Sequence, residues 1–429
     1  MESISVLYNH FLKCSGVCTD TRNIKPDCLF VALKGEKFDA NKFAEEALTK
    51  GAKYAIIDNA EYKTKDSLLL VNDSLKALQQ LANHHRKELG LPIIALTGSN
   101  GKTTTKELIN AVLSSEYNTK ATLGNLNNHI GVPLTLLSFT KETEIGIVEM
   151  GANHQKEIEF LCSIAEPNFG YITNFGKAHL EGFGGIEGVI KGKSELYNYL
   201  TANTRTAFVN LDDPIQVEKT ESISRVTFAV DNYNTDVRIE AIEANPMVKI
   251  IYNGITIQSN LIGEYNGTNI AAAITIGNYF KVSDTKIKQA VENYFPSNNR
   301  SQVLEHKGNK VIMDAYNANP SSMDVALNNF FQLNDSNKVA ILGDMFELGE
   351  ESYDEHQKIV EKLLSEEKTT VYFVGRHFFD CKTEKENIYF FRDYDTFAYH
   401  LKKHPLPGKN TILIKGSRGM ALERTLEVL

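Results

Sequence analysis

The chain has 429 residues, of which 42% are hydrophobic and 23% charged, and its formal net charge is −8. This length exceeds what one hydrophobic core usually serves and suggests about three domains, while the composition is typical of a globular protein rather than a disordered one. The acidic balance and the lack of a basic block argue against a nucleic-acid partner, and no apolar run approaches the ~18 residues of a membrane helix.

The amino terminus lacks a basic region followed by an apolar core, so we expect no export signal and a cytoplasmic location. The cysteines are odd in number, and no second pair or histidine lies near the first two to complete a zinc site. We therefore expect reduced thiols at positions 14, 18, 28, 162 and 381.

In chain order, residues 1–89 mix short apolar runs with amphipathic stretches, which predicts a small α/β unit. Its strands and helices are expected at 29–33, 41–50, 54–57 and 74–88.

In residues 90–297 strands alternate with helices, which predicts a mostly parallel sheet with helices on both faces. The expected elements are 93–97, 103–115, 145–150, 154–164, 169–173, 186–200 and 207–210. Between 225 and 259 the pattern becomes strand-like on both sides of Asn253 and Gly254, a hairpin signal, so an antiparallel patch is inserted or appended. Helices are expected again from 266 to about 294.

The Pro/Ser/Asn cluster at 295–299 marks the next boundary, and residues 298–429 form a second alternating unit, expected to be Rossmann-like. Its elements are expected at 311–314, 321–333, 338–342, 353–366, 370–374 and 411–414.

A phosphate-binding loop is predicted by IIALTGSNGKTTTKE at 93–107, where an apolar strand runs through a glycine-bearing turn into a helix. Gly98 and Gly101 let the backbone approach a phosphate, Lys102 supplies a positive charge and Thr103 a hydroxyl for Mg²⁺. The strict spacing GxxxxGK[ST] is not met, since its first glycine would fall at Leu96. The alternative is an ordinary turn that carries Gly-Lys-Thr by chance.

Two further side chains point to a metal. Glu149 closes an apolar strand, so its carboxylate is expected at the carboxyl edge of the sheet, beside Thr103. His179 follows a strand in the glycine-flanked segment NFGKAHLEGFGG and can bind a metal through one ring nitrogen. The alternatives are a solvated glutamate and a packed or surface histidine.

Three segments of the last third lie at predicted strand ends, DAYNANPSSM, GDMFELGEES and KGSRGM. Together they supply Asp, Asn, Lys, Ser and Arg side chains suited to phosphates and carboxylates, although each is also compatible with an ordinary loop. The cleft between the two larger α/β units is therefore the expected site.

Taken together, TGSNGKTTTKE, VEMGAN, AHLEGFG, YNGTNIAAA, DAYNANPSSM and GDMFELGEES resemble the Mur ligases of peptidoglycan synthesis. The resemblance covers essentially the whole chain, because TDTRNIKPDCLFVALKGEKFDANKFAEEAL at 19–48 is similar to the family's UDP-binding domain. It implies three domains: a UDP-substrate domain (1–89), an ATP-binding domain (90–297) and a carboxyl-terminal ligand-binding domain (298–429).

The resemblance also implies roles for individual residues. Lys102, Glu149, His179 and Lys193 would be catalytic, and Lys193 is similar to the family's carbamylated lysine, with Lys191 close enough to keep the choice open. Magnesium ligands would be Thr103, Glu149, His179 and carbamylated Lys193. The nucleotide would contact Gly98, Ser99, Asn100, Gly101, Lys102, Thr103, Thr104, Asn269, Arg300, Asp314 and Asn317. Substrates would contact Asp20, Thr21, Arg22, Asn128, Asn319, Asp344, Lys415 and Arg418.

The implied reaction uses ATP and Mg²⁺, with two ions expected, to join D-alanyl-D-alanine to a UDP-N-acetylmuramoyl-tripeptide through an acyl phosphate. A monomer that binds neither nucleic acid nor membrane is expected. The rivals are another amide ligase of the superfamily, which adds the third amino acid or extends folates, and a nucleotide-binding relative that has lost catalysis.

Overall fold

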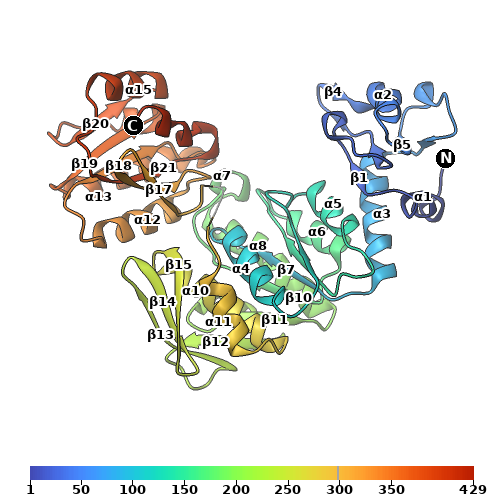
Figure 1. The fold of residues 1–429 in the computed structure, drawn as a ribbon, viewed down its shortest axis with the longest axis horizontal. Helices are drawn as coiled ribbons and strands as arrows, with labels where there is room; N and C mark the ends of the chain where they lie inside the picture. The colour runs from blue at the N-terminus through green and yellow to red at the C-terminus, as the bar shows by residue number, and fades with distance from the viewer. Residues whose placement is uncertain (297–298) are drawn as a thin grey trace.

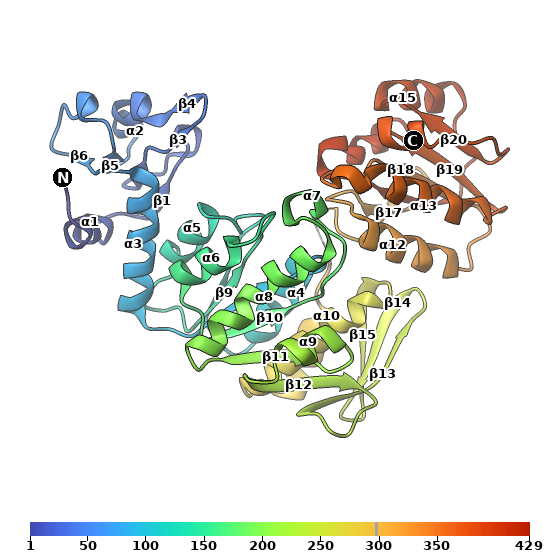
Figure 2. The ribbon, with the colours of Figure 1, turned by 180° about the vertical axis from the view of Figure 1, so that it is seen from behind.

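The computed structural model describes residues 1–296 and 299–429, which form three α/β units, each built on its own main sheet. Figures 1 and 2 show the amino-terminal and carboxyl-terminal units on opposite sides of the middle unit. The predicted α/β class is confirmed. The expected boundary between 297 and 298 falls on the two residues outside the described ranges.

The amino-terminal unit contains a four-stranded parallel sheet in the order β1-β2-β5-β6. Its second strand, Leu-Phe-Val, is buried on both faces, as expected of a short parallel strand that helices cover. The elements are α1 (Ile4–Phe11), β1 (Val17–Cys18), β2 (Leu29–Val31), the hairpin of β3 (Lys34–Gly35) and β4 (Phe38–Asp39), α2 (Ala44–Thr49), β5 (Tyr54–Ile57) and β6 (Leu68–Leu70).

Helix α3 (Ser74–Leu89) joins the amino-terminal unit to the middle one. It begins where the Asp73 carboxylate accepts the N–H of Lys76 and ends at Gly90, whose φ of +64° permits the left-handed cap. Near its end the guanidinium of Arg86 donates to the Ala165 carbonyl at 3.0 Å and to Asn168 Oδ1 at 2.9 Å. The expected boundary after residue 89 therefore assigns α3 to the first unit, although the end of this helix is also bound to the middle unit.

The central sheet has nine strands in the order β15-β14-β13-β12-β11-β10-β7-β9-β8. The strands from β13 to β8 run parallel, and the hairpins of β13, β14 and β15 are antiparallel, so the antiparallel patch is appended to the edge of the same sheet. The strands are β7 (Ile93–Thr97), β8 (Thr119–Ala121), β9 (Ile145–Glu149), β10 (Phe169–Ile172), β11 (Thr206–Asn210), β12 (Ser224–Val230), β13 (Val237–Ala244), β14 (Met247–Tyr252) and β15 (Ile255–Ile262).

Helices cover both faces of this sheet because its central strands are apolar on both sides. Along β7, Ile94 and Leu96 face one core while Ile93 and Ala95 face the other, as the two-residue period of a strand requires. One face carries α4 (Lys102–Leu113), α10 (Tyr265–Tyr279) and α11 (Asp284–Glu292). The other carries α5 (Gly131–Leu137), α6 (Glu157–Ala165) and α8 (Ile186–Ala202), and the short α7 (Leu180–Phe183) and α9 (Pro214–Lys219) follow β10 and β11.

The carboxyl-terminal unit has a six-stranded sheet in the order β16-β17-β21-β18-β19-β20, parallel except for the edge strand β16. Its strands are β16 (Gln302–His306), β17 (Asn309–Asp314), β18 (Lys338–Gly343), β19 (Thr369–Val374), β20 (Ile388–Phe391) and β21 (Thr411–Lys415). Its helices are α12 (Pro320–Gln332), α13 (Ser352–Leu364), α14 (Arg376–Asp380) and α15 (Tyr394–Lys403). Within the two described ranges, no helix combines the length and the apolar character needed to cross a membrane.

Candidate nucleotide-dependent active site

A cavity of about 1160 Å³ lies where the carboxyl edge of the central sheet meets the carboxyl-terminal unit. The loops after β7, β9 and β10 line it from the middle unit, and Asp314, Asn319 and Lys415 line it from the other unit. The carboxyl ends of parallel strands are the usual ligand edge of open α/β sheets. The cavity therefore occupies the place that the sequence predicts.

The loop between β7 and α4 needs glycine at two positions. Gly98 has a φ of +143°, and a Cβ there would lie 2.0 Å from Thr173 Oγ1, which donates a hydrogen bond of 2.6 Å to the Asn100 carbonyl. Gly101 has a φ of +78°, and a Cβ there would lie 2.8 Å from Asn269 Oδ1. The loop is thus pressed against β10 and α10, which fixes its shape without the glycine at position 96 that the strict phosphate-loop pattern demands.

Lys102 turns back on this loop, since its ammonium donates to the carbonyls of Gly98 at 2.7 Å and Ser99 at 3.1 Å. Burial lowers the pKa of Lys102 to about 8, against the opposing effect of Glu149. A phosphate in the cavity would favour the charged lysine, because a nearby opposite charge stabilises the charged form.

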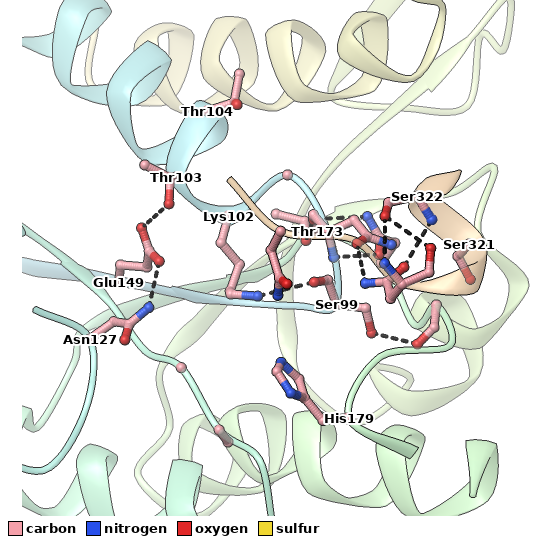
Figure 3. A pocket seen from close by; sticks show the side chains of 18 of the residues that line it. Ser99, Lys102, Thr103, Thr104, Asn127, Glu149, Thr173, His179, Ser321 and Ser322 are labelled. Atoms are coloured by element: carbon pink, nitrogen blue, oxygen red, sulfur yellow. Dashed lines mark hydrogen bonds between the residues drawn. The ribbon is translucent and has the colours of Figure 1, made fainter. Parts of the chain in front are cut away.

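Thr103 and Glu149 form the pair that the sequence places side by side. Thr103 Oγ1 donates to Glu149 Oε2 at 2.9 Å, and Asn127 Nδ2 donates to Glu149 Oε1 at 2.8 Å (Figure 3). Glu149 is only 1% exposed. A hydroxyl, a buried carboxylate and an amide facing one cavity are the oxygen donors that Mg²⁺ prefers, so these residues fit the ion.

Lys193 is fully buried, whereas Lys191 is exposed, so their surroundings differ sharply. The amine of Lys193 donates to the Ala152 carbonyl at 3.0 Å and lies 4.8 Å from the centre of the Phe183 ring. Burial, followed by the charge of Lys102, holds the pKa of Lys193 well below its usual value. The neutral amine favoured by this environment is the form that can add to CO₂.

His179 stands at the start of α7 with a left-handed φ of +54° and lines the cavity. Figure 3 shows its ring pointing into the cavity from the side opposite Thr103. Its Nδ1 contacts the Glu347 carboxylate of the carboxyl-terminal unit, and this contact lowers the pKa of Glu347.

The expected nucleotide contacts from the last third also line the cavity, together with Asn269 of α10. The Arg300 guanidinium lies 3.5 Å above the centre of the Tyr316 ring. Asp314 pairs with Lys415 at 2.6 Å, and Lys415 also contacts the Asn317 carbonyl at 3.4 Å.

Two expected substrate residues in the cavity wall already have structural partners. Asn319 begins α12, and its Nδ2 donates to Asn100 Oδ1 at 2.7 Å across the two units. Asn128 Oδ1 accepts the N–H groups of Ile130 and Gly131 at the start of α5.

Two others lie outside the lining of the cavity. The Asp344 carboxylate accepts the N–H groups of His377 and Phe378, both at 3.0 Å, and so caps α14. Arg418 is exposed and pairs with Glu423 at 3.2 Å. Their position after strands β18 and β21 is as expected, but the pattern of the sequence did not reveal that each side chain turns to a neighbour in its own unit.

Asp20, Thr21 and Arg22 lie in the amino-terminal unit, outside the lining of this cavity. Arg22 donates to the Asp20 carboxylate and lowers the pKa of Asp20 to about 2. Arg22 is exposed and Asp20 half-buried on the surface of the amino-terminal unit.

Sequence reasoning missed several residues that shape the site. Tyr265 lines the cavity, and its hydroxyl lies 2.6 Å from Ser301 Oγ, while the backbone N–H of Ser301 donates to Asp314 at 3.0 Å. The position of Tyr265 directly before NGTN and of Tyr316 within DAYNANP is the signal that could have found them.

Comparison with known proteins assigns the three units to one family. Models of that family match residues 13–86 (Mur ligase family, catalytic domain), 96–277 (Mur ligase middle domain) and 299–418 (Mur ligase, glutamate ligase domain). The UDP-N-acetylmuramoyl-tripeptide–D-alanyl-D-alanine ligase of Bacillus subtilis is 33% identical over 96% of this chain and 93% of its own length.

Solved structures agree. The crystal structure of MurF from Acinetobacter baumannii has a TM-score of 0.86 at 30% identity and covers 99% of this chain and 97% of its own. MurF ligase from Thermotoga maritima in complex with ADP has a TM-score of 0.83 at 27% identity, covering 97% of both chains.

Proposed function

The chain belongs to the Mur ligase family, and we propose that it joins D-alanyl-D-alanine to a UDP-N-acetylmuramoyl-tripeptide with ATP as the phosphoryl donor. The observation that carries this proposal is the single cavity that collects Lys102, Glu149 and His179 from the middle unit with Asp314 and Lys415 from the carboxyl-terminal unit. The full-length likeness to UDP-N-acetylmuramoyl-tripeptide–D-alanyl-D-alanine ligases favours this substrate pair over those of the rival amide ligases. A monomeric state and a cytoplasmic location belong to the same proposal.

The chemical task explains the residues. A carboxylate resists attack by an amine because oxide is a poor leaving group. ATP supplies the phosphoryl group that converts the terminal carboxylate of the tripeptide to an acyl phosphate, and Mg²⁺ would offset the charge of the phosphates. The dipeptide amine then attacks the acyl carbon, phosphate leaves, and the amine loses a proton.

The residues of the cavity would bind two anionic groups side by side, the phosphates of ATP and the terminal carboxylate of the tripeptide. Lys102 and the N–H groups of the loop at 98–103 would meet the phosphates at the start of α4. Thr103 and Glu149 would hold one magnesium ion, and His179 with a carbamate on Lys193 would hold the second. Asn269, Arg300, Asp314 and Asn317 would bind the rest of the nucleotide, since all four line the same cavity.

The remaining assignments follow the family. Asp20, Thr21 and Arg22 would bind the UDP moiety on the amino-terminal unit, which requires the substrate to extend from that unit to the cavity. Asn128 and Asn319 line the cavity and are placed to meet the substrates there. Asp344 and Arg418 would act through the loops that they stabilise, because their side chains lie outside the lining.

The test is phosphate release by the purified protein with ATP, Mg²⁺, D-alanyl-D-alanine and UDP-N-acetylmuramoyl-tripeptide, omitting each substrate in turn. Release should require all of them, and Lys102→Met should lower kcat by roughly 100-fold or more. Lys120→Met is the matched control, because that half-buried lysine also donates to a backbone carbonyl, Ser138 O at 2.7 Å, but lies outside the cavity lining. Release that ignores the dipeptide would refute the proposal.

A further inference from the structure

Residues 176–181 of the middle unit form a seam with the carboxyl-terminal unit. The N–H of Lys177 donates to Ser321 Oγ at 2.8 Å, and its ammonium pairs with the buried carboxylate of Glu355 at 2.7 Å. The N–H of Glu181 donates to the Glu347 carbonyl at 3.3 Å. His179 lies between these contacts, and its Nδ1 meets the side chain of Glu347.

The backbone that leads to Glu347 is held by hydrogen bonds within the carboxyl-terminal unit. The preceding N–H groups are all occupied: Met345 donates to His356 Nε2 at 3.0 Å and Phe346 to Ser417 Oγ at 2.9 Å. Glu347 itself adopts a left-handed φ of +61°, a backbone conformation that sets the direction in which its side chain leaves the chain. Its direction is therefore set by the fold of that unit and not by the histidine that it meets.

The contact also fixes the chemistry of His179. A carboxylate only accepts hydrogen bonds, so Nδ1 of His179 carries the hydrogen and Nε2 is left with a lone pair when the ring is neutral. The ring points into the cavity (Figure 3). A carboxylate behind a histidine in this way is the common arrangement that orients a metal-ligating imidazole.

We propose that Glu347 is a positioning residue that orients His179 for metal binding, so that the metal site of the middle unit is complete only when the carboxyl-terminal unit is docked. The proposal rests on the metal-binding role of His179 given under the proposed function. An exposed ion pair of this kind contributes little stability by itself, so the contribution of Glu347 lies in orientation.

The consequence is a coupling between domain position and catalysis. With the seam open, His179 keeps its place on the middle unit but loses the acceptor that selects its Nδ1–H form and its ring orientation. Phosphoryl transfer would then be suppressed until Lys177, His179 and Glu181 have met the carboxyl-terminal unit, the arrangement that also encloses the cavity.

The experiment measures how much Mg²⁺ tightens binding of a β,γ-imido ATP analogue, by titration calorimetry in Mg²⁺ and in EDTA. The variants are Glu347→Ala, Glu347→Gln, His179→Ala and the double variant Glu347→Ala/His179→Ala. Glu350→Ala is the matched control, since Glu350 is an exposed carboxylate three residues away in the same segment.

We expect Glu347→Ala to reduce the Mg²⁺ enhancement roughly tenfold, with binding in EDTA unchanged. Glu347→Gln, which keeps an acceptor oxygen, should lose less, Glu350→Ala should lose nothing, and Glu347→Ala should add no loss once His179 is alanine. A wild-type enhancement in Glu347→Ala, or an equal loss in the His179→Ala background, would overturn the proposal. If His179→Ala itself keeps the full enhancement, the metal-binding role of His179 fails, and this inference fails with it.

Discussion

Replacing Gly98 by alanine tests whether the phosphate loop is held by its contact with Thr173, the residue directly after β10. A Cβ at this position would lie 2.0 Å from Thr173 Oγ1 and 3.0 Å from the Thr173 nitrogen, at a φ of +143° that L-residues rarely adopt. The backbone strain costs about 1–3 kcal/mol, and loss of the hydrogen bond from Thr173 to the Asn100 carbonyl costs about 1 kcal/mol more. We expect Gly98→Ala to destabilise the protein by about 2–4 kcal/mol and to weaken ADP binding at least tenfold.

Two further variants separate the cost of the positive φ at position 98 from the cost of the steric clash with Thr173. Gly254→Ala is the control for backbone strain alone, because Gly254 has a φ of +70° with open space around its missing Cβ. Thr173→Ala removes the closest atom, so the cost of Gly98→Ala should fall by about 1–2 kcal/mol in that background. Calorimetric unfolding midpoints and ADP titrations give both quantities. Equal effects of Gly98→Ala and Gly254→Ala, or no recovery with Thr173→Ala, would refute the reasoning.

Three other predictions concern the buried Lys193, the buried His356 and the ion pair between Lys177 and the buried carboxylate of Glu355. Lys193→Met should leave the unfolding midpoint unchanged or higher, because the lysine is fully buried with one hydrogen bond and methionine fills the same space. Phosphate release should fall roughly 100-fold. A large drop in the unfolding midpoint would contradict this prediction. Burial lowers the pKa of His356 in the folded protein below the ordinary 6.5. Between the folded and the unfolded pKa the unfolded chain binds more protons, so the free energy of unfolding should fall as the pH drops through this range. The total loss is ~1.4 kcal/mol for each pH unit by which the folded pKa lies below 6.5. His356→Gln, which cannot titrate, should show a smaller dependence in urea unfolding at several pH values. Lys177→Met removes the ion pair with Glu355 across the two units, so the population in which the carboxyl-terminal unit is undocked should rise roughly tenfold. The radius of gyration measured by X-ray scattering should rise with it. Lys358→Met removes the other lysine partner of Glu355, which lies in the same unit as Glu355, and should leave the radius of gyration unchanged.

The sequence predicted the elements that carry the site because their signals are local. The strand from Ile93 to Thr97 is apolar up to Leu96 and buried throughout, and the glycines that follow have the positive φ values that a phosphate loop needs. Glu149 likewise ends its strand beside Thr103, since adjacent parallel strands deliver their ends to one edge. The short strands β1, β3, β4 and β6 were missed, because two or three residues carry no periodicity.

Side-chain direction was the harder problem. Asp314 ends one buried strand and Asp344 directly follows another strand of the same sheet, and nothing in the local pattern separates them. Yet Asp314 faces the cavity and pairs with Lys415, while Asp344 turns to cap the short helix α14. The difference depends on Gly375, whose missing Cβ leaves room for the Asp344 carboxylate 2.3 Å from where it would stand. That contact joins residues 31 positions apart, beyond the reach of a sequence window.

The contacts between the units explain why one cavity can serve two chemical steps. The acyl phosphate must be shielded from water until the dipeptide amine arrives, which a rigid cleft open to solvent cannot achieve. Here the groups proposed to bind phosphate and metal lie on the middle unit, whereas Asn319, Ser321, Glu347 and Glu355 approach from the carboxyl-terminal unit. Docking therefore encloses the cavity and orients His179 through one set of contacts. Separating the units would remove both the shield and the orientation, so the open position, which admits water, would also fail to transfer the phosphoryl group.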